Sequence, residues 1–262
     1  MKKTKVIIPA LGLLLLSTAA SVTGTVAWFS ANATVSASSL SIKANVDANL
    51  FIENGIVAAV DSVTHTTATL SGDGVSATKV APVDFDQTDG LIARVPATYS
   101  TNPDVAEAGT AATWTTVATL SSGTSGAVTG SAKDGGGTYV PKDYFVYGYV
   151  TIARKQTTAA TFNLAATATV NYGVESNLNK AFRVGLLIDN GSLIESADNS
   201  AVSGNVALFN GQQVATGLAD NQVHVILLLA WFEGADSDCY TNNAVSLSTN
   251  TITWQFTSSN AA

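Results

Sequence analysis

The residues that could do chemistry in this chain are few and widely separated. The sequence has two histidines, His65 and His224, and one cysteine, Cys239. A zinc site needs several such ligands in a close pattern, and no H-E-x-x-H motif is present. His65 lies in a threonine-rich stretch and is expected at the surface. His224 lies in the most apolar run, where a hydrogen-bonded core or interface histidine is expected. No metal ligands are predicted among these residues.

One acidic motif resembles the start of a calcium loop. In "DFDQTDG", Asp84, Asp86 and Asp89 resemble the start of such a loop. However, the third acid and the glycine come one place late, and Val95 stands where a bidentate glutamate belongs. An acidic turn is the alternative. A metal near Asp84–Asp89, or near Asp236–Asp238, is left open at this point.

Nucleophile and phosphate motifs are also missing from the sequence. No G-x-S-x-G occurs, and "GTSGAVTG" lacks the strand–turn–helix context that a catalytic serine needs. The glycines at 135–137 are not followed by the Lys–Ser/Thr pair of a phosphate loop. Cys239 has Asp236 and Asp238 close by, whose charges would raise the pKa of its thiol. The sequence therefore predicts no catalytic residue and no cofactor, and the enzyme class is the weaker one.

The elements that would position such residues are predicted to be β-strands. Apolar residues recur at every second position in "TFNLAATATVNY" (161–172), "AFRVGLLI" (181–188) and "TITWQF" (251–256). In "YFVYGYVTIA" (144–153), aromatic residues alternate with mostly aliphatic ones, so both faces are expected to be covered. "QVHVILLLAWF" (222–232) is apolar on both faces, which predicts a central buried strand. Turn motifs such as "DNG" (189–191) and "FNGQ" (209–212) separate the runs. This pattern predicts an all-β fold, an antiparallel β-sandwich.

One long flexible stretch, "SSGTSGAVTGSAKDGGG" (121–137), interrupts the pattern. It is either a surface loop or a seam between an insertion at about 55–135 and a main body at about 139–257. We favour a loop region within one elaborated sandwich. The predicted organisation is a signal peptide over 1–28 and a single β-sandwich domain over 29–262.

The start of the chain is typical of an export signal. Lys2, Lys3 and Lys5 precede an apolar stretch from Val6 to Leu16. This stretch is short for a membrane span, which needs roughly 20 apolar residues, and Pro9 interrupts it. We expect a signal helix that meets the membrane only transiently; a retained anchor is the alternative.

Composition limits the possible partners. Charged residues make up 12% of the chain and hydrophobic residues 46%, which is enough apolar material for a sizeable core. The formal net charge is −7, and loss of the three leading lysines would bring it to −10. An acidic surface argues against nucleic acid and anionic lipid as partners. A single cysteine excludes an internal disulfide, so stability must come from the core, from assembly, or from both.

Two stretches resemble a known group of proteins. Thr25, Ala27, Phe29 and Ser30 match the "T-x-A-x-F-S/N" signal motif of exported biofilm-matrix fibre proteins of the TasA and camelysin type. "SASSLSIKA" stands where that family has its first strand, and "LLLAWFEGADSDCYTNNAVSLSTNTITWQF" is similar to the closing strands of related exported proteins. Together the two stretches cover roughly a quarter of the chain.

The resemblance implies a β-sandwich of jelly-roll type that polymerises into extracellular fibres. In that family the amino-terminal strand inserts into the sheet of the next subunit, which is β-augmentation in physical terms. A head-to-tail contact of this kind does not close and builds a filament. Some members are described as metallopeptidases. Because this chain offers no zinc ligand set, that activity is not carried over.

The signal cleavage region and the assembly segment are predicted to adjoin each other. Small residues favour cleavage after Ala27 or after Ala33, and the resemblance places the new amino terminus near Phe29. The predicted cleavage region comprises Ala27, Trp28, Phe29 and Ala33. Val35 and Ala37 occupy odd positions, whereas the apolar residues of the next run occupy even ones. This change of phase at Ser38–Ser39 needs a bulge or a break. The predicted strand-donor and assembly residues are Phe29, Val35, Ala37, Leu40 and Ile42.

Two interpretations of this segment stay open. In the first, residues 29–37 form an exchanged donor arm while 40–46 stay in the parent sandwich. In the second, one bulged strand folds back onto its own subunit. The leading functional interpretation is a secreted structural protein at the cell surface, which pairs with copies of itself and with other matrix proteins. A non-polymerising surface adhesion module is the first alternative, and a camelysin-like extracellular metallopeptidase is the second.

Overall fold

The computed structural model describes residues 35–36, 41–44, 49–70, 76–77, 82–87, 90–96, 114–123, 126–130, 144–158, 160–236, 238–239 and 250–261. This part of the chain is almost entirely β-structure, with two short 3-10 turns, η2 (Val60–Ser62) and η4 (Asn177–Ala181). None of its helical turns is long and apolar enough to cross a membrane. The predicted signal segment, 1–28, lies outside the described residues.

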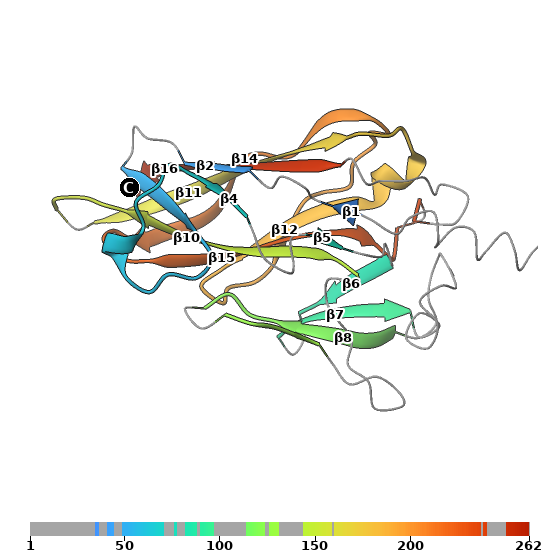
Figure 1. Cartoon of the computed structure of the whole chain (residues 1–262), viewed down its shortest axis with the longest axis horizontal. Coiled ribbons are helices and arrows are strands. Elements are labelled where there is room, and N and C mark those ends of the chain that lie inside the picture. The colour runs from blue at the N-terminus through green and yellow to red at the C-terminus, as the bar shows by residue number, and fades with distance from the viewer. Residues whose placement is uncertain are drawn as a thin grey trace, which may run out of the picture.

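Five strands form the outer sheet, at the top of Figure 1. Their pairings are antiparallel, except that β16 and β2 run parallel over four residue pairs. In order across the sheet, the strands are β14 (Gly204–Ala219), β11 (Thr161–Tyr172), β16 (Thr251–Asn260), β2 (Ser41–Ala44) and β4 (Thr67–Thr69).

A second group of antiparallel strands forms the middle sheet. Its order is β13 (Ile194–Glu195), β12 (Phe182–Ile188), β15 (His224–Glu233), β10 (Val146–Arg154) and β3 (Leu50–Asn54). Apart from β13, successive strands of the two sheets cross from one sheet to the other along the chain. This alternation is the connectivity of a β-sandwich of jelly-roll type. The predicted fold class is confirmed, with the β16–β2 pair as a parallel exception to its antiparallel pairing.

A third layer, which we call the meander, packs on the other face of the middle sheet (Figure 1). It contains β6 (Pro82–Asp86), β7 (Leu91–Pro96), β8 (Trp114–Leu120) and β9 (Val128–Gly130) in antiparallel order. β6 also pairs in parallel with the end of β15, at Phe232 and Glu233. These strands fall within 55–135, the stretch expected to be an insertion or a loop elaboration.

The three layers enclose two hydrophobic cores. The first lies between the outer and middle sheets and includes Trp254 and Phe256 of β16. The second lies between the middle sheet and the meander and includes Val95 and Val117. A fully buried side chain of this kind stabilises the fold by about 1.5–3 kcal/mol relative to exposure.

Strand β15 contributes alternate residues to both cores. Leu228 faces the first core, and Leu227, Leu229 and Trp231 face the second. This is the central buried strand that the sequence predicted. β11 behaves differently: its predicted inward residues are buried, and the residues between them are partly or fully exposed. The buried set is Phe162, Leu164, Ala166, Ala168, Val170 and Tyr172.

Candidate functional site

The predicted assembly segment is described at two points, in β1 (Val35–Ser36) and in β2. Val35 lies in β1, and Ile42 lies in β2. The remaining predicted cleavage and assembly residues lie outside the described residues. They are Ala27, Trp28, Phe29, Ala33, Ala37 and Leu40.

β1 is held by a very short ladder. It pairs antiparallel with β5 (Ser76–Ala77), with Val35 opposite Ala77 and Ser36 opposite Ser76. These two strands form a separate two-stranded sheet outside the outer and middle sheets. A two-stranded ladder of this length is marginal by itself in water.

β2 is embedded much more firmly. It lies between β16 and β4, so that Ile42 is opposite Trp254 on one side and Ala68 on the other. The buried Ala44 donates its N–H to the Thr66 carbonyl at 2.8 Å. The segment thus belongs to two different sheets on either side of residues 37–40, where the sequence predicted a change of phase.

In the structure, the two described carboxylates of the first acidic motif form ion pairs with an arginine. Asp84 and Asp86 lie on β6, and Arg94 lies on the adjacent strand β7. The Arg94 guanidinium binds both carboxylates, at 2.5 Å from Asp84 Oδ2 and 2.7 Å from Asp86 Oδ2. Charge-assisted cross-strand pairs of this kind hold the register of a hairpin. Asp89 lies outside the described residues.

The second acidic motif also forms an ion pair with an arginine. Arg183 of β12 is 3% exposed, and its Nη2 lies 2.6 Å from both Asp198 Oδ1 and Asp236 Oδ2. Asp236 also accepts the Asp238 N–H at 2.8 Å, which closes the turn after β15. Within the described residues, no group of three or more His, Cys, Asp or Glu side chains is arranged to hold a metal ion.

A cleft of about 550 Å³ opens where β6, β12, β13 and β15 meet. Its walls include Asp84, Glu195 and Glu233 together with Arg183. Burial, and then the neighbouring negative charges, raise the pKa of Glu195 and of Glu233, although Arg183 opposes this for Glu195 and hydrogen bonds oppose it for Glu233. The Glu233 carboxylate accepts the Trp231 indole N–H at 3.1 Å. The cleft is therefore acidic, and Arg183 already pairs with Asp198 and Asp236.

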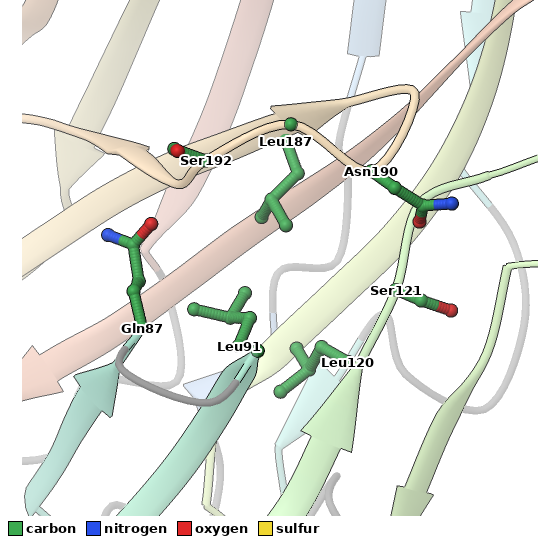
Figure 2. A pocket seen from close by; sticks show the side chains of 9 residues that line it. Gln87, Leu91, Leu120, Ser121, Leu187, Asn190 and Ser192 are labelled. Atoms are coloured by element: carbon green, nitrogen blue, oxygen red, sulfur yellow. The ribbon is translucent and has the colours of Figure 1, made fainter.

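A neutral cleft of about 440 Å³ lies at the end of the meander (Figure 2). Figure 2 shows Leu91, Leu120 and Leu187 converging from three different strands to form its apolar floor. The amides at its rim are committed to structure: Asn190 Oδ1 accepts the N–H groups of Ser122 and Gly123, both at 2.7 Å. This cleft offers shape and hydroxyl groups rather than a reactive group.

The histidines and the cysteine are placed much as the sequence predicted. His65 is exposed and its Nδ1 contacts Glu53 Oε2 at 2.7 Å. His224 is buried and hydrogen-bonded to Asp189. Cys239 is 1% exposed, and burial raises the pKa of its thiol, with the charge of Asp236 adding to this effect. A buried, protonated thiol is a poor nucleophile.

Sequence reasoning missed the buried arginines. Arg154 is 2% exposed and forms two bonds with Asp220, at 2.6 and 3.0 Å, and it also donates to Asn260 and to the Thr161 carbonyl. The available signal was a lone arginine inside an apolar run, as Arg183 is in "AFRVGLLI". Its carboxylate partners lie many residues away, so the pairing itself could not be read from the chain.

Comparisons with known proteins do not identify a family for this chain. No protein-family model matches the chain, and a search of curated proteins finds no match. Among solved structures, the chain is similar to the one titled "AvmM Catalyzes Macrocyclization in Alchivemycin A Biosynthesis". The match has 8% sequence identity and a TM-score of 0.23, and covers 45% of this chain and 80% of that one. A match this weak carries no argument about function, so the TasA and camelysin resemblance rests on the quoted motifs alone.

Proposed function

We propose that this protein is an exported, non-catalytic structural subunit that assembles through its amino-terminal segment. The donated part is residues 29–37, which leaves its own β5 and pairs with another copy, while β2 stays in the parent sandwich. The partner is a second copy of the same chain, within an extracellular matrix that includes other proteins. The leader motif and the resemblance to matrix fibre proteins support export.

The observation that carries the proposal is the contrast between β1 and β2. Among the described residues, β1 has two residue pairs, both with β5, whereas β2 has four pairs with β16 and three with β4. Releasing β1 costs one short ladder, and releasing β2 would split the outer sheet. A segment that is weakly held and lies next to a firmly held strand is suited to exchange between copies.

Paired cysteines test the exchange directly. Val35→Cys with Ala77→Cys is introduced after Cys239→Ser has removed the native thiol. Residues directly opposite in an antiparallel pair are close enough for a disulfide. In filaments seen by negative-stain microscopy, we expect this pair to give ladders of cross-linked subunits on a non-reducing gel.

A matched control uses the neighbouring strand. Ile42→Cys with Ala68→Cys reports on the β2–β4 pair and should cross-link only within one chain. The donor-arm proposal is wrong if filaments form while both cysteine pairs stay intramolecular. The assembly proposal itself is wrong if the mature protein forms no filaments and deletion of 29–37 changes neither its size nor its stability.

A non-polymerising binding module is the second candidate, and the neutral cleft of Figure 2 favours it. Its hydroxyl groups over a leucine floor form the kind of surface that neutral ligands use. Binding of a soluble glycan to the monomer, abolished by Leu187→Trp, would support this function over assembly.

A further inference from the structure

We infer that protonated His224 is a pH-sensitive pin, a side chain that links the end of β14 in the outer sheet to the turn after β12 in the middle sheet. His224 is the first residue of β15. Its ring lies between Asp189, which follows β12, and Ala219, which ends β14. One side chain therefore connects three strands from two sheets.

The geometry around the ring places one oxygen partner at each ring nitrogen. Nδ1 lies 2.6 Å from Asp189 Oδ2, and Nε2 lies 3.0 Å from the Ala219 carbonyl oxygen. An ionised carboxylate and a carbonyl oxygen only accept hydrogen bonds, so both ring nitrogens donate when Asp189 carries its charge. A neutral imidazole has one N–H and would leave one of these contacts without a hydrogen. The contacts fit the imidazolium form.

The middle-sheet end of the pin is rigid. Ile188 to Gly191 form a tight turn in which Asp189 and Asn190 both have positive φ, 49° and 62°, and the Gly191 N–H donates to Ile188 O at 2.8 Å. These are the signs of a type I′ turn, which fits the twist of a hairpin. Asp189 also exchanges two bonds with the Val225 backbone, at 2.9 and 3.0 Å. The Asp189 carboxylate is therefore held in place for His224.

The pin lies beside an apolar groove. This groove, of about 220 Å³, separates the β12–β13 connection from β14. Asp189 lines it on one side, and Leu218, next to Ala219, lines it on the other. Its apolar walls include Ile188, Ile194 and Val214. Weakening the contact between His224 and Ala219 removes one of the bonds that hold the end of β14 at the mouth of this groove.

The surroundings set the direction of the pH effect. Burial lowers the pKa of His224, but the hydrogen bonds to Asp189 and Ala219 and the Asp189 charge raise it by more, so it lies above its usual 6.5. Other charged groups near the ring are Arg154 of β10 and Asp220, which pair with each other. The Arg154 guanidinium contacts the Phe162 ring of β11, which packs edge-on against His224. The pin is at full strength below pH 6.5 and is lost as the pH rises through the folded-state pKa.

Hydrogen exchange of the full chain measures the pin. Amide exchange of β14 is followed by mass spectrometry from pH 5.5 to 9 and corrected for the intrinsic exchange rate. Above the pKa of His224, the opening of β14 should increase up to tenfold for each pH unit until it reaches a plateau. His224→Gln should give a flat profile that is already raised at pH 5.5. Asp189→Asn, which tolerates positive φ, should move the midpoint to lower pH.

The matched control is His65→Gln, because His65 also contacts a carboxylate but its side chain is 64% exposed. It should keep the profile of the unchanged protein. NMR titration of His224 in the unchanged protein provides a measurement that does not depend on any variant folding. A midpoint at or below 6.5, or a neutral ring at pH 6, would overturn the inference. So would a β14 profile in His224→Gln that still follows pH.

Discussion

The outer sheet and the middle sheet differ sharply in charge. Four of the five outer strands, β4, β11, β14 and β16, contain no Asp, Glu, Lys or Arg, and β2 contributes Lys43 alone. Among the described residues, every ion pair joins side chains from the middle sheet, the meander or the turns beside them. Within the part of the chain that the structure describes, charge is concentrated around the sheet that is most deeply buried.

The burial of the middle sheet explains the difference. An outer strand such as β11 has one apolar face, and a slip of one residue would turn that face to solvent. β15 is apolar on both faces, so alternation alone would not oppose a slip. Ion pairs near its two ends, His224–Asp189 and Arg183–Asp236, fix the strand relative to its neighbours. Buried polar groups that specify register are known in other proteins, although they need not add stability.

The largest effect is expected at the buried pair of Arg154 and Asp220. Asp220→Ala would leave the Arg154 guanidinium buried without its carboxylate, which should cost about 3–5 kcal/mol of unfolding free energy. Urea unfolding followed by tryptophan fluorescence measures this. The double variant Arg154→Met with Asp220→Ala is the control, and should recover much of the loss. A cost below about 1 kcal/mol for the single change would show that solvent reaches the guanidinium.

A second comparison uses adjacent residues on opposite faces of β15. Leu228→Ala empties part of the first core, and Leu229→Ala empties part of the second. Both side chains are almost fully buried, so each change should cost about 2–5 kcal/mol. The same urea series compares them. If Leu229→Ala costs far less than Leu228→Ala, the meander is a loosely attached layer and the middle sheet has only one true core.

The sequence predicted most strands of the sandwich, but it did not predict the ion pairs between distant parts of the chain. Alternation identified the inward residues of β11, and the double apolar pattern identified β15, because both signals are local. The meander was expected as a loop region, since its strands are short and separated by polar stretches. The ion pairs of Arg154 and Arg183 could not be predicted, because their partners lie 66, 15 and 53 residues away. Long-range pairing depends on topology, which no local pattern records.

A smaller effect is expected at the partly exposed ion pairs of the meander. Arg94→Leu would remove both ion pairs to Asp84 and Asp86, whose side chains are about a quarter exposed. Such pairs typically contribute about 0.2–1 kcal/mol each. The loss should shrink as salt is raised, because mobile ions screen exposed pairs. A loss that is large and independent of salt would place Arg94 among the buried register-fixing groups instead.

The smallest effect is expected on the exposed face of the outer sheet. Gln255 is exposed on β16, between residues whose side chains are buried, Trp254 and Phe256. Gln255→Lys adds a charge opposite Lys43 of β2 without disturbing the core, so the unfolding free energy should fall by no more than about 1 kcal/mol. Trp254→Ala, one residue away, is the contrasting control and should cost about 3–5 kcal/mol. An unchanged stability for Gln255→Lys would mean that folding does not require the outer sheet to be neutral. A loss comparable to that of the tryptophan would mean that another layer covers this face. The outer sheet would then be buried on both faces, as the middle sheet is, and burial would not explain the difference in charge.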